Sequence, residues 1–169
     1  SSYISALQST GTLACAKHFL GNQTEFYRRR SNSITDERTI MEIYTPAFKA
    51  AIDAGVATVM TAYNQLNGEW AGESKYVITD LLRGTLGFKG MVMSDWNSIY
   101  DWKNVILSGQ NLDMPGEDAF YIKKKPADLV AEGVVTEKDI ENMIRPTIAT
   151  CIRWGLYDRY NSGKQYDRS

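Results

Sequence analysis

Residues 90–96 read Gly-Met-Val-Met-Ser-Asp-Trp, and the order of the segments around them indicates the fold. The apolar run over residues 90–93 predicts a short buried strand that ends at Ser94, Asp95 and Trp96. A helical pattern precedes it over residues 74–86 and another follows over residues 99–107. Gly87 and Gly109 come directly after these patterns or shortly after them, as is typical of helix ends. The stretch is therefore predicted to be one strand between two helices.

The same alternation extends in both directions. Strands are predicted over residues 12–19, 56–62 and 111–114, and helices over residues 35–54, 119–132 and 136–154. Thr35 and Thr136 are expected to cap two of these helices. A β-α-β-α order predicts parallel strands joined by helical crossovers, which is an α/β fold. Four such units are half of an eight-unit barrel, although on spacing alone a small doubly wound sheet fits the length better.

Composition excludes several classes of function. The chain has 169 residues, enough for one domain with a core, and 43% are hydrophobic and 23% charged, as in soluble globular proteins. The net charge of -1 gives no general attraction to nucleic acid or to an anionic membrane, and no apolar stretch is long enough to span one. The basic runs Arg28–Arg30 and Lys123–Lys125 are predicted to be solvated surface. Because residue 1 is serine, we expect a fragment or a processed form.

The cysteine and histidine content argues against a metal site. Cys15 and Cys151 are predicted to be buried and unpaired. His18 is the only histidine in the chain, and no second histidine or cysteine lies at ligand spacing from it. A lone histidine in a strand is more often a hydrogen-bonded structural group than a catalyst. We expect no metal and no cofactor.

Polar residues at the predicted strand ends form the candidate site. The carboxyl ends of parallel strands carry the sites of α/β folds, so these residues should converge on one rim. They are Lys17-His18, then Met60 with Tyr63-Asn64, then Asp95-Trp96, and finally Asp113-Met114.

Asp95 follows an apolar run, so its carboxylate is expected to be partly desolvated, with Lys17 or His18 nearby to keep it ionised. Such a carboxylate can attack an anomeric carbon, and Trp96 beside it offers an apolar face to a sugar ring. The alternative is that Asp95 caps the following helix, which spacing alone favours. Met60 alone indicates an apolar floor, and Tyr63 either donates a hydrogen bond to a carboxylate or covers the core.

Five segments, in order and in spacing, resemble glycoside hydrolase family 3, the β-glucosidase family. The resemblance runs from about Leu13 to Arg159. The segments are Lys17-His18-Phe19 with Asn22, Glu25 and Arg28; Asp36–Thr39 with Glu42–Tyr44; Met60–Asn64 with Asn67-Gly68; Gly87–Gly90 with Ser94–Trp96; and Leu112–Gly116. It implies that residues 1–157 are four β/α units, half of a TIM-type (β/α)8 barrel, and that residues 158–169 are a polar tail.

The resemblance also implies roles. Asp95 would be the nucleophile, Lys17 and His18 would hydrogen-bond sugar hydroxyls in the -1 subsite, and Met60 and Tyr63 would line that subsite. Trp96 would border the -1 and +1 subsites. Glu25 and Arg28 would support the site structurally.

The resemblance further implies what this chain lacks. The first half of the barrel would supply an aspartate and an arginine that grip the sugar, and a second domain would supply the acid/base glutamate. We therefore expect part of a retaining β-glucosidase, acting on terminal non-reducing β-D-glucosyl residues and inactive alone. The N-acetylglucosaminidase branch is disfavoured because Leu20-Gly21-Asn22 brings no second histidine, whereas β-xylosidase specificity stays open.

Two further interpretations of the sequence stay open. The chain could be a non-catalytic carbohydrate-binding or degenerate fragment. Half a barrel would also leave two unpaired strand edges, which could pair in a homodimer. The compartment cannot be read from the residues; the resemblance favours an extracellular or periplasmic parent protein.

Overall fold

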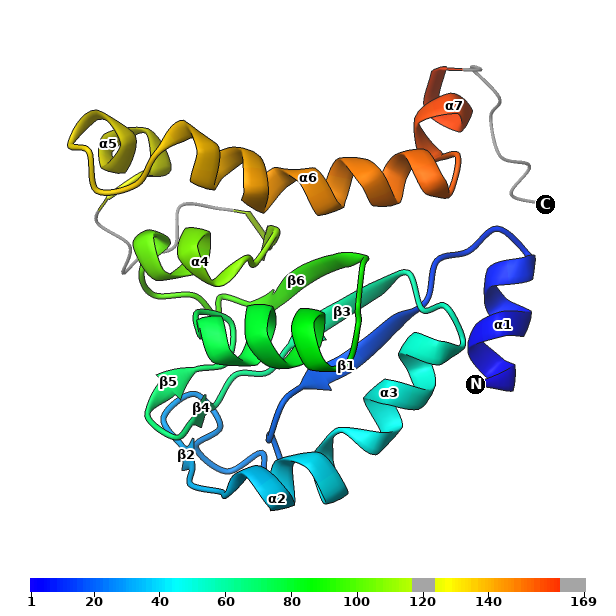
Figure 1. Cartoon of the computed structure of the whole chain (residues 1–169), viewed down its shortest axis with the longest axis horizontal. Helices are drawn as coiled ribbons and strands as arrows, with labels where there is room; N and C mark the ends of the chain where they lie inside the picture. The colour runs from blue at the N-terminus through cyan, green and yellow to red at the C-terminus, as the bar shows by residue number, and fades with distance from the viewer. Residues whose placement is uncertain (117–123, 162–169) are drawn as a thin grey trace.

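A four-stranded parallel sheet forms the centre of the computed structural model, which describes residues 1–116 and 124–161. Its strands are β1 (Cys15–Phe19), β3 (Thr58–Thr61), β6 (Met91–Trp96) and β7 (Leu112–Met114). They lie in the order β1-β3-β6-β7, and every neighbouring pair is parallel (Figure 1). All four predicted strands are therefore present.

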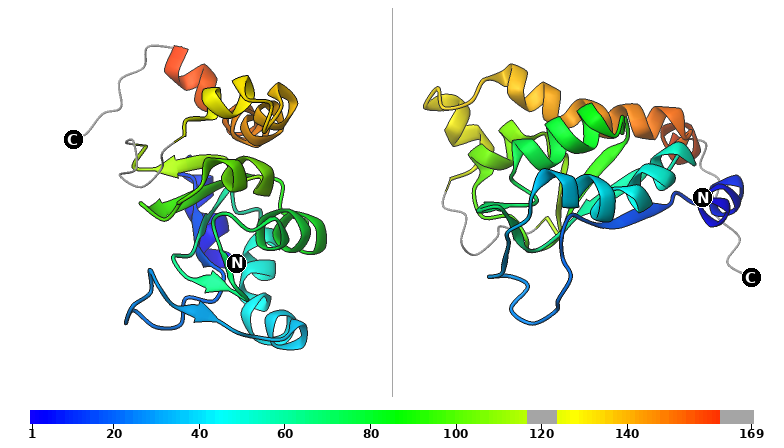
Figure 2. Two further views of the ribbon diagram at one scale, coloured as in Figure 1. Left: turned by 90° about the vertical axis from the view of Figure 1, so that its left-hand side faces the viewer. Right: turned by 60° about the horizontal axis from the view of Figure 1, so that its bottom comes forward.

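The strand order excludes a doubly wound sheet. In such a sheet the order reverses at a switch point, whereas here the order follows the chain in one direction. The crossover helices α3 (Pro46–Asp53) and η2 (Tyr76–Thr85) also lie on the same side of the sheet (Figure 2). The fold is that of an opened half of a (β/α)8 barrel, and the interpretation based on spacing was wrong. Within the described residues, β1 and β7 each pair with one strand of this sheet only.

The predicted helix over residues 35–54 is instead three segments. These are α2 (Glu37–Thr39), the wider π-helical turn η1 (Ile40–Tyr44) and α3. The cap is Asp36 and not Thr35, because the Asp36 carboxylate accepts a hydrogen bond from the Thr39 amide at 2.7 Å. Within this wider turn Ile40 is buried, whereas Ile43 is 70% exposed.

The helix α1 (Ser2–Ser9) was not predicted, whereas the later helices mostly match the predicted ranges. The helix α4 (Trp102–Ser108) follows its cap Asp101 and is followed by Gly109. The helix α6 (Glu137–Arg153) carries the predicted cap Thr136, which exchanges hydrogen bonds with Asp139. The helix α5 (Pro126–Ala131) covers part of the predicted range 119–132, of which residues 119–123 lie outside the described residues.

The segment 158–169 was expected to be a polar tail, and α7 (Leu156–Asn161) includes its first four residues. Residues 162–169 lie outside the described residues. The Arg159 side chain donates a hydrogen bond to the Gly11 carbonyl at 3.0 Å, which joins the two ends of the described chain. The start of this segment is therefore part of the folded structure.

A second, small sheet was not predicted. It consists of β2 (Asn32–Ser33), β4 (Gln65–Leu66) and β5 (Glu69–Trp70). The antiparallel strands β4 and β5 are joined by Asn67 and Gly68, whose φ angles are 51° and 95°. An Asn-Gly pair favours this tight hairpin turn. The Asn67-Gly68 pair is therefore a signal in the sequence from which this hairpin could have been predicted.

The main core lies between the sheet and its crossover helices. Fully buried side chains from both layers pack there, which is the burial that stabilises parallel sheets. They include Phe19, Val59, Leu81, Leu82 and Val92. A smaller cluster of Ile106, Leu129 and Val135 holds α4, α5 and α6 together.

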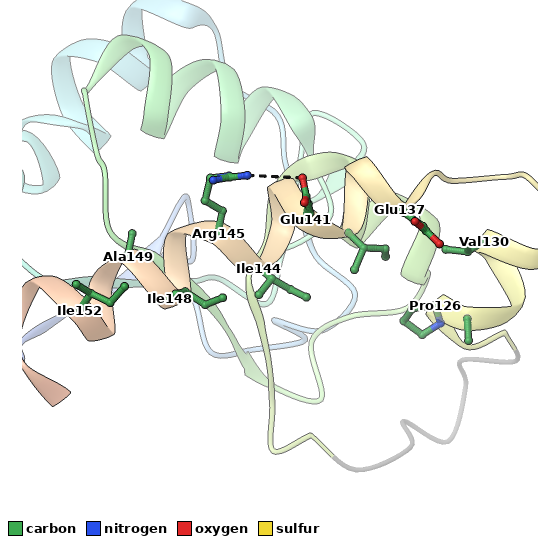
Figure 3. A pocket seen from close by; sticks show the side chains of 11 residues that line it. Pro126, Val130, Glu137, Glu141, Ile144, Arg145, Ile148, Ala149 and Ile152 are labelled. Carbon is green, nitrogen blue, oxygen red and sulfur yellow. Dashed lines mark ion pairs between the residues drawn. The ribbon is translucent and has the colours of Figure 1, made fainter. Parts of the chain in front are cut away.

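One face of α6 remains exposed and apolar. Ile144, Ile148 and Ile152 are 41%, 54% and 64% exposed, and with Pro126 and Val130 of α5 they line a groove of about 810 Å³ (Figure 3). No described helix has the length and apolar character needed to cross a membrane. The lining residues of this apolar groove come from α5 and α6 only, so none of the predicted site residues belongs to it.

The two cysteines are free, as predicted, but they are not buried. Cys15 is exposed and Cys151 is half-buried. Cys15 begins β1, an edge strand whose side chains alternate between more and less exposed positions, so its side chain is not covered. The apolar residues beside Cys15 in the sequence therefore led to a wrong prediction that its side chain is buried.

Candidate active site

Asp95 lies within strand β6, close to the end of that strand at Trp96. Ser94 joins this strand end to β7, because its hydroxyl accepts a hydrogen bond from the Met114 amide at 2.8 Å and donates to the Asp113 carboxylate at 3.2 Å. Asp95 itself is 7% exposed. A buried carboxylate is thus placed at the carboxyl end of a central strand.

Three donors surround the Asp95 carboxylate. The Trp96 amide donates to its Oδ1 atom at 2.7 Å, and the His18 Nε2 atom lies 3.1 Å from its Oδ2 atom. The Tyr63 hydroxyl donates the third hydrogen bond. The helix-capping interpretation of Asp95 is wrong, because α4 is capped by Asp101. The predicted convergence of Asp95, His18 and Tyr63 is confirmed.

His18 contacts Asp95 in its neutral form at ordinary pH. Burial lowers its pKa below that of a free histidine, and the negative charge of Asp95 partly opposes this shift. The group is protonated more readily in the unfolded chain. His18 therefore lowers the free energy of unfolding as the pH falls below about 6.5.

We expect this pKa shift to be measurable directly, because His18 is the only histidine and gives one imidazole C2–H signal in a proton NMR titration. The midpoint should lie below about 6.5. Asp95→Asn should lower it further, since the opposing negative charge is removed. Asp80→Asn, at an exposed position, should leave it unchanged. A wild-type midpoint above that of a free histidine would contradict the burial of this imidazole.

Tyr63 is 4% exposed and remains a phenol. Burial raises its pKa first, and its hydrogen bond to Asp95 and the negative charge of Asp95 raise it further. The guanidinium groups of Arg28 and Arg29 lie over its ring, at 4.3 Å and 4.5 Å from the centroid. These cation–π contacts hold the ring between the two arginines and the carboxylate.

Two arginines of the basic run Arg28–Arg30 contact this site, and the contacts of Arg29 were not predicted. Arg28 forms an ion pair with Glu25 at 2.7 Å, which fits the predicted supporting role. Arg29 was treated as solvated surface, but it donates to the backbone carbonyls of Trp96 and Asn97, both at 2.8 Å. Only the position of the run, shortly after the end of β1, could have indicated this contact. Lys124, in the other run, forms a surface ion pair with Glu132, while Lys123 lies outside the described residues.

The other predicted site residues lie around this centre. In the sheet register Lys17 is opposite Met60, and Met60 is opposite Met93. Within the described part of the chain, neither Lys17 nor Met60 hydrogen-bonds to Asp95, although the charge of Lys17 contributes to lowering the pKa of His18. Trp96 is 54% exposed. Its side chain is thus accessible beside the buried carboxylate.

No metal site is evident in the described part of the chain. Across residues 1–116 and 124–161, no group of three or more histidine, cysteine, aspartate or glutamate side chains could hold an ion. The site consists of a carboxylate, its hydrogen-bond donors, and two cations that contact a tyrosine ring. It can orient a carboxylate toward a ligand at the rim of the sheet.

Comparison with known proteins identifies relatives that share this arrangement of elements. Residues 1–145 match the family described as Glycosyl hydrolase family 3 N terminal domain. The chain is 39% identical over 152 residues to probable beta-glucosidase L of Emericella nidulans, which covers 86% of this chain and 21% of the relative. It is 38% identical over 158 residues to a beta-glucosidase of Rhizobium radiobacter, covering 93% of this chain and 19% of that protein.

Solved structures of beta-glucosidases also match the fold of this chain. Beta-glucosidase 3B of Thermotoga neapolitana, in a structure with glucose, matches with a TM-score of 0.87 and 29% identity over 99% of this chain and 24% of that chain. A Trichoderma reesei beta-D-glucoside glucohydrolase matches with a TM-score of 0.82 and 35% identity over 92% of this chain and 22% of that chain. The chain thus spans about a fifth of the length of the curated relatives it matches. It belongs to glycosyl hydrolase family 3.

Proposed function

We propose that this chain carries the nucleophile half of a retaining β-glycosidase, and that Asp95 is the nucleophile. The observation that carries the proposal is the Asp95 carboxylate, buried at a strand end and held by His18, Tyr63 and the Trp96 amide. The substrate is proposed to be a terminal non-reducing β-D-glucosyl residue. The beta-glucosidases among the relatives support this choice of sugar.

In the proposed reaction, an Asp95 carboxylate oxygen attacks the anomeric carbon and the bond to the leaving oxygen breaks. A carboxylic acid from outside this chain protonates that oxygen. Water then attacks the covalent glycosyl ester, returns Asp95 to its carboxylate form and gives a product with retained configuration. Retention requires the two carboxyl groups to be about 5–5.5 Å apart.

The remaining rim residues are proposed to bind the sugar. The exposed ring of Trp96 offers an apolar face against which a pyranose can stack. Lys17 can donate hydrogen bonds to sugar hydroxyls, and the second ring nitrogen of neutral His18 can accept one. Met60 and Tyr63 line the same subsite. Because the Tyr63 hydroxyl donates to Asp95, it also fixes the orientation of the carboxylate before the sugar binds.

The proposed reaction also needs the acid/base carboxyl group, which comes from outside this chain. We propose that further parts of the same polypeptide supply the acid/base glutamate and close the sheet at the edges of β1 and β7. General acid/base catalysis typically contributes about 10²–10⁴-fold, so the isolated chain is proposed to be inactive on ordinary glucosides. Pairing of these edges in a homodimer is the competing possibility, and sedimentation of the isolated chain as a monomer would remove it.

Trapping the covalent intermediate tests the proposal. The longer polypeptide that contains this chain would be incubated with 2,4-dinitrophenyl 2-deoxy-2-fluoro-β-glucoside, and the labelled peptide found by mass spectrometry. We expect one label, on Asp95, and none in Asp95→Asn. A label on another carboxylate would refute the assignment. Glucose binding without any labelling would instead favour a carbohydrate-binding fragment without turnover.

A further inference from the structure

Arg29 links two distant parts of the chain. It belongs to the loop between β1 and β2, which projects from the sheet (Figure 2), yet its guanidinium lies at the end of β6. The Nη2 atom donates to the Trp96 carbonyl and the Nη1 atom to the Asn97 carbonyl, both at 2.8 Å. A guanidinium holds its donors in a rigid planar fork. Two donors on successive carbonyls therefore fix the backbone direction there, not only its distance.

These carbonyls belong to the two residues that follow Asp95. The Trp96 amide lies on the other side of the Trp96 Cα atom and donates to the Asp95 carboxylate at 2.7 Å, so a shift of the Trp96–Asn97 backbone would move this donor. Asn97 has a positive φ of 53°, and its amide donates to the Met114 carbonyl of β7 at 2.8 Å. The segment after the nucleophile is thus held from one side by β7 and from the other by Arg29.

Arg29 also determines how Tyr63 uses its single hydroxyl hydrogen. The Nη2 atom lies 3.4 Å from the Tyr63 hydroxyl oxygen, and the guanidinium carbon lies 4.5 Å from the ring centroid. Arginine has no acceptor, so the hydroxyl oxygen can only accept from it. The hydroxyl hydrogen is left to donate to Asp95. One side chain therefore acts on two of the three donors of the carboxylate.

We infer that Arg29 is a positioning residue, which fixes the attack geometry of Asp95 through the Trp96–Asn97 backbone and the Tyr63 hydroxyl. The inference rests on the proposed function and deepens it. Arg28 differs, since it pairs with Glu25 and stacks on the Tyr63 ring without contacting the end of β6. Arg30 provides a matched control, because its side chain makes no hydrogen bond or ion pair within the described residues.

The test uses Arg29→Met, Arg29→Lys and Arg30→Met in the longer polypeptide. For each variant, inactivation by the 2-fluoro-glucoside gives a rate constant for attack and an apparent affinity for the reagent. We expect Arg29→Met to lower the rate constant by about 10- to 100-fold with little change in affinity, because a misplacement of about 1 Å can cost about 100-fold. Arg29→Lys keeps the charge but loses the fork, so it should remain closer to Arg29→Met than to wild type. Arg30→Met should match wild type.

The outcomes separate positioning from other roles. An unchanged rate constant in Arg29→Met, or full recovery in Arg29→Lys, would overturn the inference, the latter by showing that charge alone suffices. A parallel loss of affinity and of melting temperature would overturn it in favour of general loosening. If Arg29→Met does not fold, Arg29→Lys alone decides between these results. Wild-type protein without a label on Asp95 would instead refute the proposed function itself.

Discussion

Replacing Asp95 with glycine in the longer polypeptide is expected to lower turnover of an aryl β-glucoside by about 10⁴-fold or more, the scale on which loss of a nucleophile acts in other enzymes. Glycine removes the attacking oxygen and leaves its space open. Steady-state kinetics measure the loss. Asp80→Asn, which changes an exposed carboxylate that pairs with Lys75, should leave turnover unchanged.

Chemical rescue of Asp95→Gly by azide distinguishes a nucleophile from a residue that only supports the site. Azide can enter the space left by the Asp95 side chain and attack the anomeric carbon from the same face, expelling the phenolate. The product should then be the α-glucosyl azide, in contrast to the β-glucose expected from the wild type under the proposed mechanism. Loss of activity without rescue would indicate that Asp95 supports the site structurally. A β-azide product would place the nucleophile on another residue.

Gly90→Ala is expected to destabilise the fold more than any surface change. A Cβ atom at this position would lie 2.1 Å from the Ala57 carbonyl oxygen and 2.7 Å from a ring carbon of Phe88. Both neighbours are buried, and the backbone oxygen cannot move without shifting the start of β3. We expect the free energy of unfolding to fall by about 3 kcal/mol or more, at the upper end of overpacking effects. Urea denaturation followed by tryptophan fluorescence measures this.

Gly84→Ala is the matched control for this prediction. Gly84 lies in η2, and the nearest atom to an added Cβ would be the Thr79 carbonyl oxygen at an ordinary 3.4 Å. Alanine is favoured over glycine in a helix by about 1 kcal/mol. This variant should therefore be as stable as wild type or more so. Equal denaturation midpoints for the two variants would show that β3 and β6 do not approach closely at Gly90.

Much of the fold was predictable because it depends on patterns that are local in sequence. Val59 and Val92 are fully buried under the crossover helices, and Met60 and Met93 on the other face are half-buried, so both runs are apolar. Errors of one or two residues occurred where neighbouring residues could serve equally well. Thr35 and Asp36 are both good caps, and only the path of the folded chain decides between them.

The part of the site that consists of contacts between side chains could be predicted from the sequence. His18, Tyr63 and Asp95 each follow or end a strand, so the rule that strand ends converge placed them together. The contacts of Arg29 could not be found this way, because two of its partners are backbone carbonyls, which every residue carries. The exposure of Ile148 could not be predicted either, because an apolar helix face has the same sequence pattern whether or not other residues of this chain cover it.

The three side chains at the proposed reaction centre come from three different places in the sheet: His18 from β1, Tyr63 from just beyond β3 and Asp95 from β6. A ligand that bridges them has no comparable binding site on the unfolded chain. Its binding free energy therefore adds to conformational stability, by about 2.7 kcal/mol at 100 times the dissociation constant. Melting temperature can consequently rank glucose, xylose and related sugars as ligands, even in a polypeptide that converts none of them.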